Sequence, residues 1–585
     1  MHKEEVAAVL DEIGVLLELQ GENAFRCNAY RNAARAVEQL EGDLGEAVSS
    51  GRLAGVRGIG DTLREKITTL VTTGSLPFYD QLRAKTPPGL FQMLRVGGLG
   101  PKKVKALYDQ LGVDDLDKLK AACEAGHVAG LKGFGEKTQQ KILEGVAFLK
   151  QTADRVRIDQ AESVALGLLN ALRDAPGVRR IEACGSLRRR KETVKDIDLL
   201  VCADDAGPIM DRFVGLPGVA QVLGRGDTKS SVTIAAGEDG HRFVIQADLR
   251  VVNEDQFPFA LHYFTGSKEH NIEMRRRAQA RGLKLNEYEL AGPHRPAACR
   301  DEADLFRALG LEYVPPELRE GAGEIEAAES GGLPDLIEIS DIVGVFHNHT
   351  TYSDGGDTLE DMAKAAKALG LKYLGIADHS QSLTVANGLN ADRVRRQLAE
   401  IDALNERLKG FRVFKGTECD ILADGRLDFD DDLLATFDYV VASVHSHFKQ
   451  SREEMTDRIV RAIRHPAVTM LGHATGRLLL QREGYAVDLE AVLQAAAGAG
   501  VMVEINAHPA RLDLDWVHCR RAKALGVPIV VNPDAHSTAG LALYRFGVDV
   551  ARRGWLTKKD VFNTRPASEV ADALAERKAG RPRRK

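Results

Sequence analysis

The segment CGSLRRRKETVKDIDLLV (184–201) decides how the middle of this chain folds, because it joins a Gly-Ser turn to a strand that carries two aspartates. Asp196 and Asp198 stand two residues apart, and side chains alternate along a strand, so both face the same side. A third aspartate, Asp248, ends an apolar run on a strand that we predict to be the neighbour of the first. Three carboxylates in one place suit two divalent cations, one to activate an attacking hydroxyl and one to hold a triphosphate. The segment therefore predicts an α+β domain with a nucleotidyl-transfer site.

Length and composition place this domain among several others. With 585 residues and roughly 150 residues per domain, about four domains are expected. A net charge of −6, with 28% charged and 44% hydrophobic residues, excludes a mainly disordered chain and a uniformly basic DNA-packaging protein. No apolar stretch approaches the ~18 residues of a membrane helix, the first residues do not resemble a signal peptide, and the cysteines show no C-x-x-C spacing. We therefore expect a cytoplasmic protein with reduced thiols and no membrane partner.

The hydrophobic pattern changes along the chain. Residues 1–155 place apolar side chains at helical spacing between Gly-rich turns, which predicts an all-α region. Residues 319–336 are rich in Gly and Glu and are predicted to link two domains. After this linker, strand-like and helical stretches alternate, which predicts an α/β barrel or parallel sheet. Polar residues follow each apolar run, at the strand ends where barrel enzymes carry their chemistry.

Three repeats of one pattern occur in the all-α region: GVRGIGDTLREKI (55–67), RVGGLGPKKVKAL (95–107) and GLKGFGEKTQQKI (130–142). Each predicts a Gly-x-Gly turn followed by a helix start, where backbone N–H groups can point at an anion. The pattern resembles the helix-hairpin-helix motif, which binds the DNA backbone without reading sequence. The residues predicted to contact DNA in this way are Gly58, Gly60, Gly98, Gly100, Gly133 and Gly135, with Lys102, Lys103 and Lys137 adding positive charge.

Histidines and acidic residues end many of the apolar runs after residue 340. They form an N/O ligand set suited to several Zn²⁺, Mn²⁺ or Fe²⁺ ions, and no cysteine joins it. Such a cluster activates water and stabilises a phosphoryl transition state, so hydrolysis of a phosphate ester is the chemistry indicated. The candidate ligands are His347, His349, Asp354, His379, Glu418, His445, His473, Asp534 and His536.

The central motifs resemble those of family X DNA polymerases of the polymerase β type. Besides residues 184–201 and Asp248, the segment YFTGSKEHNIEMR (263–275) carries the resemblance. It implies that Asp196, Asp198 and Asp248 are catalytic and bind Mg²⁺ or Mn²⁺, and that the substrate is a dNTP. The residues that it implies around the nucleotide are Ser186, Arg189 and Arg157 at the triphosphate, Tyr263 and Phe264 at the sugar, Asn271 at the base and Arg275 on the template side, with Gly185 and Gly266 also counted as nucleotide-binding.

The first helical region, including FRCNAYRNAARAV (25–37), is similar to the deoxyribose-phosphate lyase domain of the same family. The similarity implies that Lys66 forms a Schiff base with a sugar aldehyde and that Tyr30 contacts DNA. Arg26 and Thr62 stand where the animal enzyme has lysines. Two interpretations therefore stay open, a lyase and a plain 5′-phosphate-binding site.

The C-terminal half is similar to the PHP (polymerase and histidinol phosphatase) family, whose fold is a distorted (β/α)7 barrel with a trinuclear metal site. Every motif position carries a ligand-capable residue, which favours an active phosphoesterase with three divalent ions. In chain order, the predicted domains are a lyase-like helical DNA-binding domain (1–80), fingers with helix-hairpin-helix motifs (81–155), a nucleotidyltransferase palm (156–260), a thumb (261–318), the linker (319–336) and a PHP domain (337–585).

This order matches the bacterial family X DNA polymerases. It implies a monomeric repair polymerase that adds dNTPs to primer 3′ ends in gapped or primed DNA. It further implies a Mn²⁺-dependent 3′→5′ exonuclease in the PHP domain, with abasic-site endonuclease and 3′-phosphatase activities beside it. Two alternatives compete with this hypothesis: a nucleotidyltransferase on another acceptor fused to a small-molecule phosphatase, and a DNA end-binding scaffold without catalysis.

Overall fold

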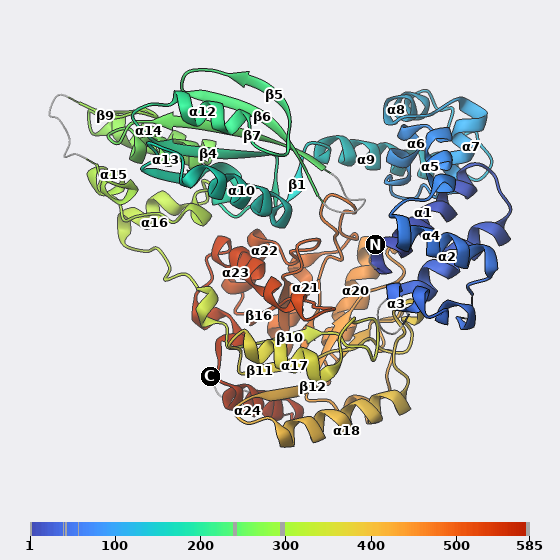
Figure 1. The fold of residues 1–585 in the computed structure, drawn as a ribbon. Coiled ribbons are helices and arrows are strands. Elements are labelled where there is room, and N and C mark those ends of the chain that lie inside the picture. Colours follow the sequence, from blue (N-terminus) through green and yellow to red (C-terminus); the bar gives the residue numbers. More distant parts are fainter. Residues whose placement is uncertain are drawn as a thin grey trace. The chain divides into compact units, whose positions relative to one another are not determined.

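The computed structural model describes residues 3–38, 40, 44–56, 58–237, 243–292 and 299–580. The chain separates into two compact units (Figure 1). The first comprises Met1–Asp154 with Gly237–Arg242, and the second comprises Arg155–Ala236 with Phe243–Lys585. Each unit has its own hydrophobic core.

The first unit is helical in its described residues, coloured from blue to teal in Figure 1. Two apolar clusters hold it together, one around Leu10 and Ile67 and another around Val104 and Ile142. Its helices are α1 (Lys3–Leu19), α2 (Ala24–Glu38), α3 (Leu44–Ser49), α4 (Asp61–Thr73), α5 (Pro77–Lys85), α6 (Pro88–Leu94), α7 (Pro101–Leu111), α8 (Leu116–Glu124) and α9 (Glu136–Thr152).

The second unit begins with a five-stranded sheet in the order β2-β4-β7-β6-β5. The β4–β7 pair is parallel and the other pairs are antiparallel. Ile197 of β4 and Ala247 and Leu249 of β7 pack into the core, and the neighbouring aspartates lie on the opposite face, where they are partly buried. The elements are β1 (Val156–Arg157), α10 (Ile158–Arg173), β2 (Arg180–Ala183), α11 (Gly185–Arg188), β3 (Thr193–Val194), β4 (Asp196–Cys202), α12 (Gly207–Val214), β5 (Val219–Arg225), β6 (Lys229–Ala236) and β7 (Phe243–Val252).

A smaller helical region follows the sheet. Its elements are α13 (Phe257–Thr265), α14 (Lys268–Ala280), β8 (Lys284–Leu285), β9 (Leu290–Ala291), α15 (Glu302–Ala308) and α16 (Glu324–Ser330). Helix α16 lies inside residues 319–336, the segment predicted as a linker. This segment packs into the same core as α14 and α15, with Ile325 and Ala328 buried. Arg319 is fully buried and pairs with Glu302, so buried charge and apolar contacts, which composition does not reveal, hold the segment in place.

The rest of the second unit is a seven-stranded sheet whose strands pair in parallel in chain order. The first and last strands also meet, through a bridge between Asn348 and Ala535 and a bond from Phe346 N to Asn532 Oδ1 at 3.0 Å. The sheet is therefore a nearly closed barrel, which confirms the predicted fold class. Its strands are β10 (Gly344–Asn348), β11 (Tyr373–Ile376), β12 (Arg412–Asp420), β13 (Tyr439–Ser443), β14 (Met470–Leu471), β15 (Met502–Asn506) and β16 (Ile529–Asn532).

Helices surround the barrel strands, and β10, β13 and β16 are buried along their whole length, as expected for a parallel sheet covered on both faces. They are α17 (Leu359–Ala368), α18 (Ala391–Arg407), α19 (Asp431–Leu434), α20 (Arg452–Ile463), α21 (Leu489–Ala499), α22 (Trp516–Ala524), α23 (Tyr544–Arg553) and α24 (Ala567–Lys578). Within the described ranges, no helix is long and apolar enough to cross a membrane.

Candidate active sites

The three palm aspartates lie together on two paired strands. Asp196 and Asp198 are on one face of β4, and Asp198 stands opposite Asp248 in the parallel register of β4 and β7. Lys229 Nζ lies 2.8 Å from Asp248 Oδ2. Burial, with the negative charges of Asp196 and Asp248, raises the pKa of Asp198 to about 7. The carboxylates therefore repel one another in a poorly hydrated place, which is the charge arrangement that divalent cations relieve.

The turn that precedes these strands is pressed against Asp198. Gly185 has φ 63°, and a Cβ atom there would lie 2.3 Å from Asp198 Oδ2. Cys184 N donates to the backbone oxygen of Asp198 at 2.8 Å. Only glycine fits this position, and Ser186 follows it directly in the one-turn helix α11. The structure thus brings the predicted triphosphate turn to the predicted metal carboxylates.

Arg189 lies beside the Thr265–Gly266 turn. Its Nη1 donates to the backbone oxygen of Thr265, and its Nε donates to Glu320 Oε1 at 3.1 Å. A Cβ atom on Gly266 would lie 3.0 Å from Arg189 Nη1, so the guanidinium occupies the space that a side chain would need. The positive charge of Arg189 also acts against the rise in the pKa of Asp198.

The remaining predicted nucleotide residues fall at separate places. Tyr263 and Phe264 meet edge to face with ring centroids 5.2 Å apart, and Asn271 Nδ2 donates to the Tyr263 backbone oxygen at 2.8 Å. Arg275 lies half-buried on α14. Arg157 lies at the start of α10, where its guanidinium pairs with Asp159 at 2.9 Å. Tyr263, Phe264 and Asn271 therefore contact one another, whereas Arg157 forms its ion pair with Asp159.

The three Gly-x-Gly turns precede helices. The second glycine of each turn, Gly60, Gly100 or Gly135, is the residue before the first turn of α4, α7 or α9. Their first glycines have positive φ angles of 98°, 86° and 88° and are Gly58, Gly98 and Gly133.

The lysines that follow these turns differ in their surroundings. Lys102 and Lys137 are exposed, whereas Lys103 Nζ donates to the Gly98 backbone oxygen at 3.2 Å and lies over the Phe134 ring. Exposed N–H groups and lysines at helix starts can bind phosphates.

Lys66 on α4 lies against an aromatic ring. Its Nζ is 3.5 Å from the centroid of Phe78, on which Tyr30 is also stacked. Burial and the charge of Arg26 lower the pKa of the Lys66 amine. A larger neutral fraction is what an amine needs to attack an aldehyde.

The nine barrel residues predicted as metal ligands gather at the carboxyl ends of the strands. Four overlapping groups of ligand atoms have members within 4.8 Å of one another, and together the groups contain all nine residues. Among the described residues, groups this tight occur only in the barrel, so the palm aspartates are more widely spaced. The groups are His349, Asp354, His379 and His536; His347, His349 and Asp534; His347, Glu418 and His473; and His379, Glu418 and His445.

Glu418 lies at the centre of the cluster. Its carboxylate is 1% exposed and lies within 3.2 Å of the imidazoles of four histidines: His347, His379, His445 and His473. Although burial favours the neutral ring, carboxylate charges raise the pKa of His445 to about 9 and that of His379 to about 10. Burial and two neighbouring histidines lower the pKa of His349 to about 3.

This donor set fits divalent cations. The buried Nε2 atoms of His347 and His349 have no hydrogen-bond partner, although each lies 3.2 Å from a carboxylate oxygen, of Glu418 and Asp534 respectively. An unpartnered nitrogen facing carboxylates is costly unless a cation lies between them. His347, His473 and Asp534 also have positive φ angles, a strained backbone that is concentrated at functional sites. A depression of about 290 Å³ opens onto the cluster.

Known protein families match four segments of this chain. A helix-hairpin-helix domain family matches residues 1–76, a SAM-like helix-hairpin-helix tandem 92–147, the DNA polymerase beta thumb 260–320 and the PHP domain 346–508. The chain is 39% identical to the "DNA polymerase/3'-5' exonuclease PolX" of Bacillus subtilis (strain 168) over 572 residues, 97% of this chain and 99% of that protein. The chain belongs to the PolX family. This finding confirms the predicted resemblance to bacterial family X polymerases.

Other relatives of this PolX chain match its barrel half. A "probable phosphatase" of Thermoanaerobacter sp. (strain X514) is 27% identical over 243 residues, 40% of this chain and 94% of that protein. One of Acetivibrio thermocellus is 28% identical over 248 residues, 41% of this chain and 97% of that protein. The barrel half of this chain therefore matches almost the whole length of these two proteins.

Two acidic residues that orient the barrel ligands, Glu504 and Asp420, are not marked by any motif in the sequence. Glu504 is fully buried, lies 2.6 Å from His347 Nδ1 and accepts from His473 N at 2.8 Å. Asp420 contacts His445 Nδ1 in the same way. These contacts turn the other ring nitrogen of His347 and of His445 toward the cluster. The signal in the sequence was an acid inside an apolar strand, VMVEIN (501–506), because a buried carboxylate needs a partner.

Arg511 is a further residue of the barrel site that sequence analysis missed. It lines the depression over the cluster, and its Nε lies 3.6 Å from Asp534 Oδ2. Its side chain is 21% exposed, so the guanidinium reaches solvent at the mouth of the site. An arginine beside a metal cluster is suited to a phosphodiester, whose oxygens it can bind in pairs. No local motif marks this residue, since the fold brings it to the site.

Proposed function

We propose that this chain is a DNA repair polymerase that adds dNTPs to primer 3′ ends in short gaps, and that its barrel is a 3′→5′ exonuclease. The observation that carries the polymerase proposal is the register of β4 and β7, which sets Asp198 opposite Asp248 with Asp196 on the same face. Family membership supports it, since the B. subtilis relative is named for both activities.

In the palm, the three aspartates would hold Mg²⁺ or Mn²⁺. Bound there, the ions would lower the pKa of the primer hydroxyl and neutralise the departing pyrophosphate. The chain's own contribution is position: the Gly185–Ser186 turn presents backbone N–H groups beside the aspartates, and Arg189 supplies a fixed positive charge. The edge-to-face pair Tyr263 and Phe264 supplies an apolar wall for the sugar.

In the barrel, the nine ligands would hold up to three Zn²⁺, Mn²⁺ or Fe²⁺ ions, which supply Lewis acidity to a phosphodiester. Glu504 and Asp420 hold the ligand imidazoles in place, and Arg511 would bind the non-bridging oxygens of the scissile phosphate. The same chemistry extends to abasic-site cleavage and to 3′-phosphate removal. In each case the substrate is a phosphate ester at a DNA end or break.

The direct test of the proposed function uses wild-type protein and a 5′-labelled primer in a one-nucleotide gap with Mn²⁺. We expect extension when dNTPs are present and stepwise shortening when they are absent, read on a sequencing gel. If the primer is neither extended nor shortened, the proposal is wrong. If it is extended but never shortened, the barrel acts on another phosphate ester, as the competing fusion with a small-molecule phosphatase would require.

A second prediction concerns Lys66, whose shielded amine favours the lyase over a plain 5′-phosphate site. We expect borohydride to trap wild-type protein on DNA that ends in 5′-deoxyribose phosphate, because the neutral amine forms a Schiff base. Lys66→Arg keeps the positive charge and should lose at least ~90% of the trapped adduct. An equal adduct in the arginine variant would show that another amine reacts, and a wild type that binds this DNA without an adduct would favour phosphate binding alone.

A further inference from the structure

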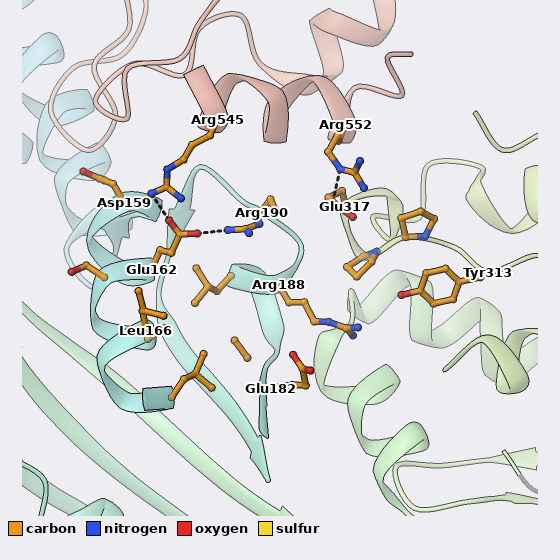
Figure 2. A pocket seen from close by; sticks show the side chains of 17 residues that line it. Asp159, Glu162, Leu166, Glu182, Arg188, Arg190, Tyr313, Glu317, Arg545 and Arg552 are labelled. Atoms are coloured by element: carbon orange, nitrogen blue, oxygen red, sulfur yellow. Dashed lines mark hydrogen bonds and ion pairs between the residues drawn. The ribbon is translucent and has the colours of Figure 1, made fainter. Parts of the chain in front are cut away.

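A helix of the barrel is joined to the polymerase half by ion pairs. Figure 2 shows Arg545 and Arg552 of α23 reaching toward the palm and thumb. Arg545 pairs with Glu162 at 2.7 Å, and Arg552 pairs with Glu317 at 2.8 Å. Glu162 also binds Arg190 at 2.6 Å, and these residues line a cavity of about 880 Å³ between the two halves. These pairs lie beside the segment 185–189 that carries the nucleotide-binding turn.

The last residue of α23 makes a different connection. Arg553 is 1% exposed, and its Nη1 donates to Glu192 Oε2 at 2.7 Å. Its Nη2 lies 3.5 Å from Glu320 Oε1, the oxygen that accepts from Arg189 Nε. A continuous series of charges therefore runs from Glu192 through Arg553 and Glu320 to Arg189. Glu320 is only 12% exposed, so water screens this series weakly.

The residues on either side of Glu320 pack against the segment that follows the Thr265–Gly266 turn. Ser267 N donates to the backbone oxygen of Arg319 at 3.0 Å, and a Cβ atom on Gly321 would lie 2.8 Å from Glu269 Cβ. The chain on both sides of Glu320 is thus packed against the turn that follows Thr265. Because a guanidinium is planar and rigid, the bonds at Nε and Nη1 fix the plane of Arg189.

We propose that Glu320 and Arg553 are positioning residues for Arg189, so that the barrel helix α23 contributes to dNTP binding in the palm. This inference rests on the proposed polymerase function. Glu320 orients the guanidinium, and Arg553 shares the charge of Glu320. Without Arg553, the carboxylate would bind Arg189 more tightly and would compete with the triphosphate for it. The barrel is then a structural part of the polymerase site as well as a separate catalytic site.

The test measures KM for the dNTP and kcat on a one-nucleotide gap with full-length protein. We expect Glu320→Ala and Arg553→Met each to raise KM about tenfold and to change kcat less than threefold. Glu320→Gln keeps an acceptor for Arg189 Nε, so its KM should stay within about threefold of wild type. Arg545→Met is the matched control, because it breaks a barrel–palm ion pair that does not touch Glu320. Its KM should stay within about twofold of wild type.

A double-mutant comparison separates positioning from general loosening of the interface. In an Arg189→Ala background, Glu320→Ala should add less than twofold to KM, because the group that it positions is gone. Nuclease activity of each preparation, measured on the same DNA, should equal that of wild type and reports an intact barrel. The inference is overturned if Arg545→Met and Arg553→Met raise KM equally. It is also overturned if Glu320→Ala raises KM as much in the Arg189→Ala background as it does in the wild type. A wild type that extends no primer would overturn the proposed function as well.

Discussion

Asp198→Asn should abolish primer extension, with kcat lower on the order of a thousand-fold, while the barrel continues to shorten the same primer. The substitution keeps the shape of the side chain and removes one negative charge. Asp198 lies opposite Asp248 and on the same strand face as Asp196, and its burial, together with these two negative charges, raises its pKa to about 7. Asparagine supplies one neutral oxygen where a divalent cation needs a carboxylate, so ions at this place should be lost or misplaced.

The measurement follows a 5′-labelled primer with and without dNTPs under single-turnover conditions. Asp204→Asn is the matched control, since Asp204 follows β4, pairs with Arg179 and is 70% exposed at its side chain. The control should extend primers within about twofold of wild type. Extension by Asp198→Asn within tenfold of wild type would show that Asp198 is not a catalytic ligand. Loss of both extension and shortening would instead indicate misfolding or one shared active site.

Local rules were sufficient for the palm carboxylates. The two-residue spacing of Asp196 and Asp198 on an apolar strand already requires a common face, and the apolar run before Asp248 predicts a neighbouring core strand. The register that sets Asp248 opposite Asp198 depends on how β4 and β7 pair in the folded protein, and the sequence does not predict it. Glycine was equally informative at Gly185, where any side chain would meet Asp198.

The segment 319–336 shows where composition fails. Its glycines and glutamates are typical of an exposed linker, yet Arg319 and Glu324 are buried. Their partners are Glu302 and His270, far enough away in the chain that no local pattern connects them. A charged residue can be buried when its partner is also brought in by the fold, and only the three-dimensional structure shows this. Glu320 was overlooked for the same reason.

Glu418→Gln should remove the barrel's nuclease activity on the order of a thousand-fold and leave primer extension within about twofold of wild type. Glu418 lies within 3.2 Å of four imidazoles, so it is shared by two of the ligand groups. Glutamine keeps the volume but removes the charge that offsets bound cations. Metal content, measured by mass spectrometry after gel filtration, should fall by at least one ion per chain.

The controls separate metal loss from substrate loss. Glu453→Gln makes the same chemical change on the exposed start of α20 and should leave both activities and the metal content unchanged. Arg511→Met leaves all nine ligands in place, so it should retain its metal and lose nuclease activity about a hundredfold through weaker binding of the scissile phosphate. If Glu418→Gln retains its metal and its nuclease activity, the cluster is not the nuclease site. If Arg511→Met loses metal together with activity, phosphate binding is not the role of Arg511. Its guanidinium in the wild type would then support the metal ligand Asp534 through their ion pair at 3.6 Å.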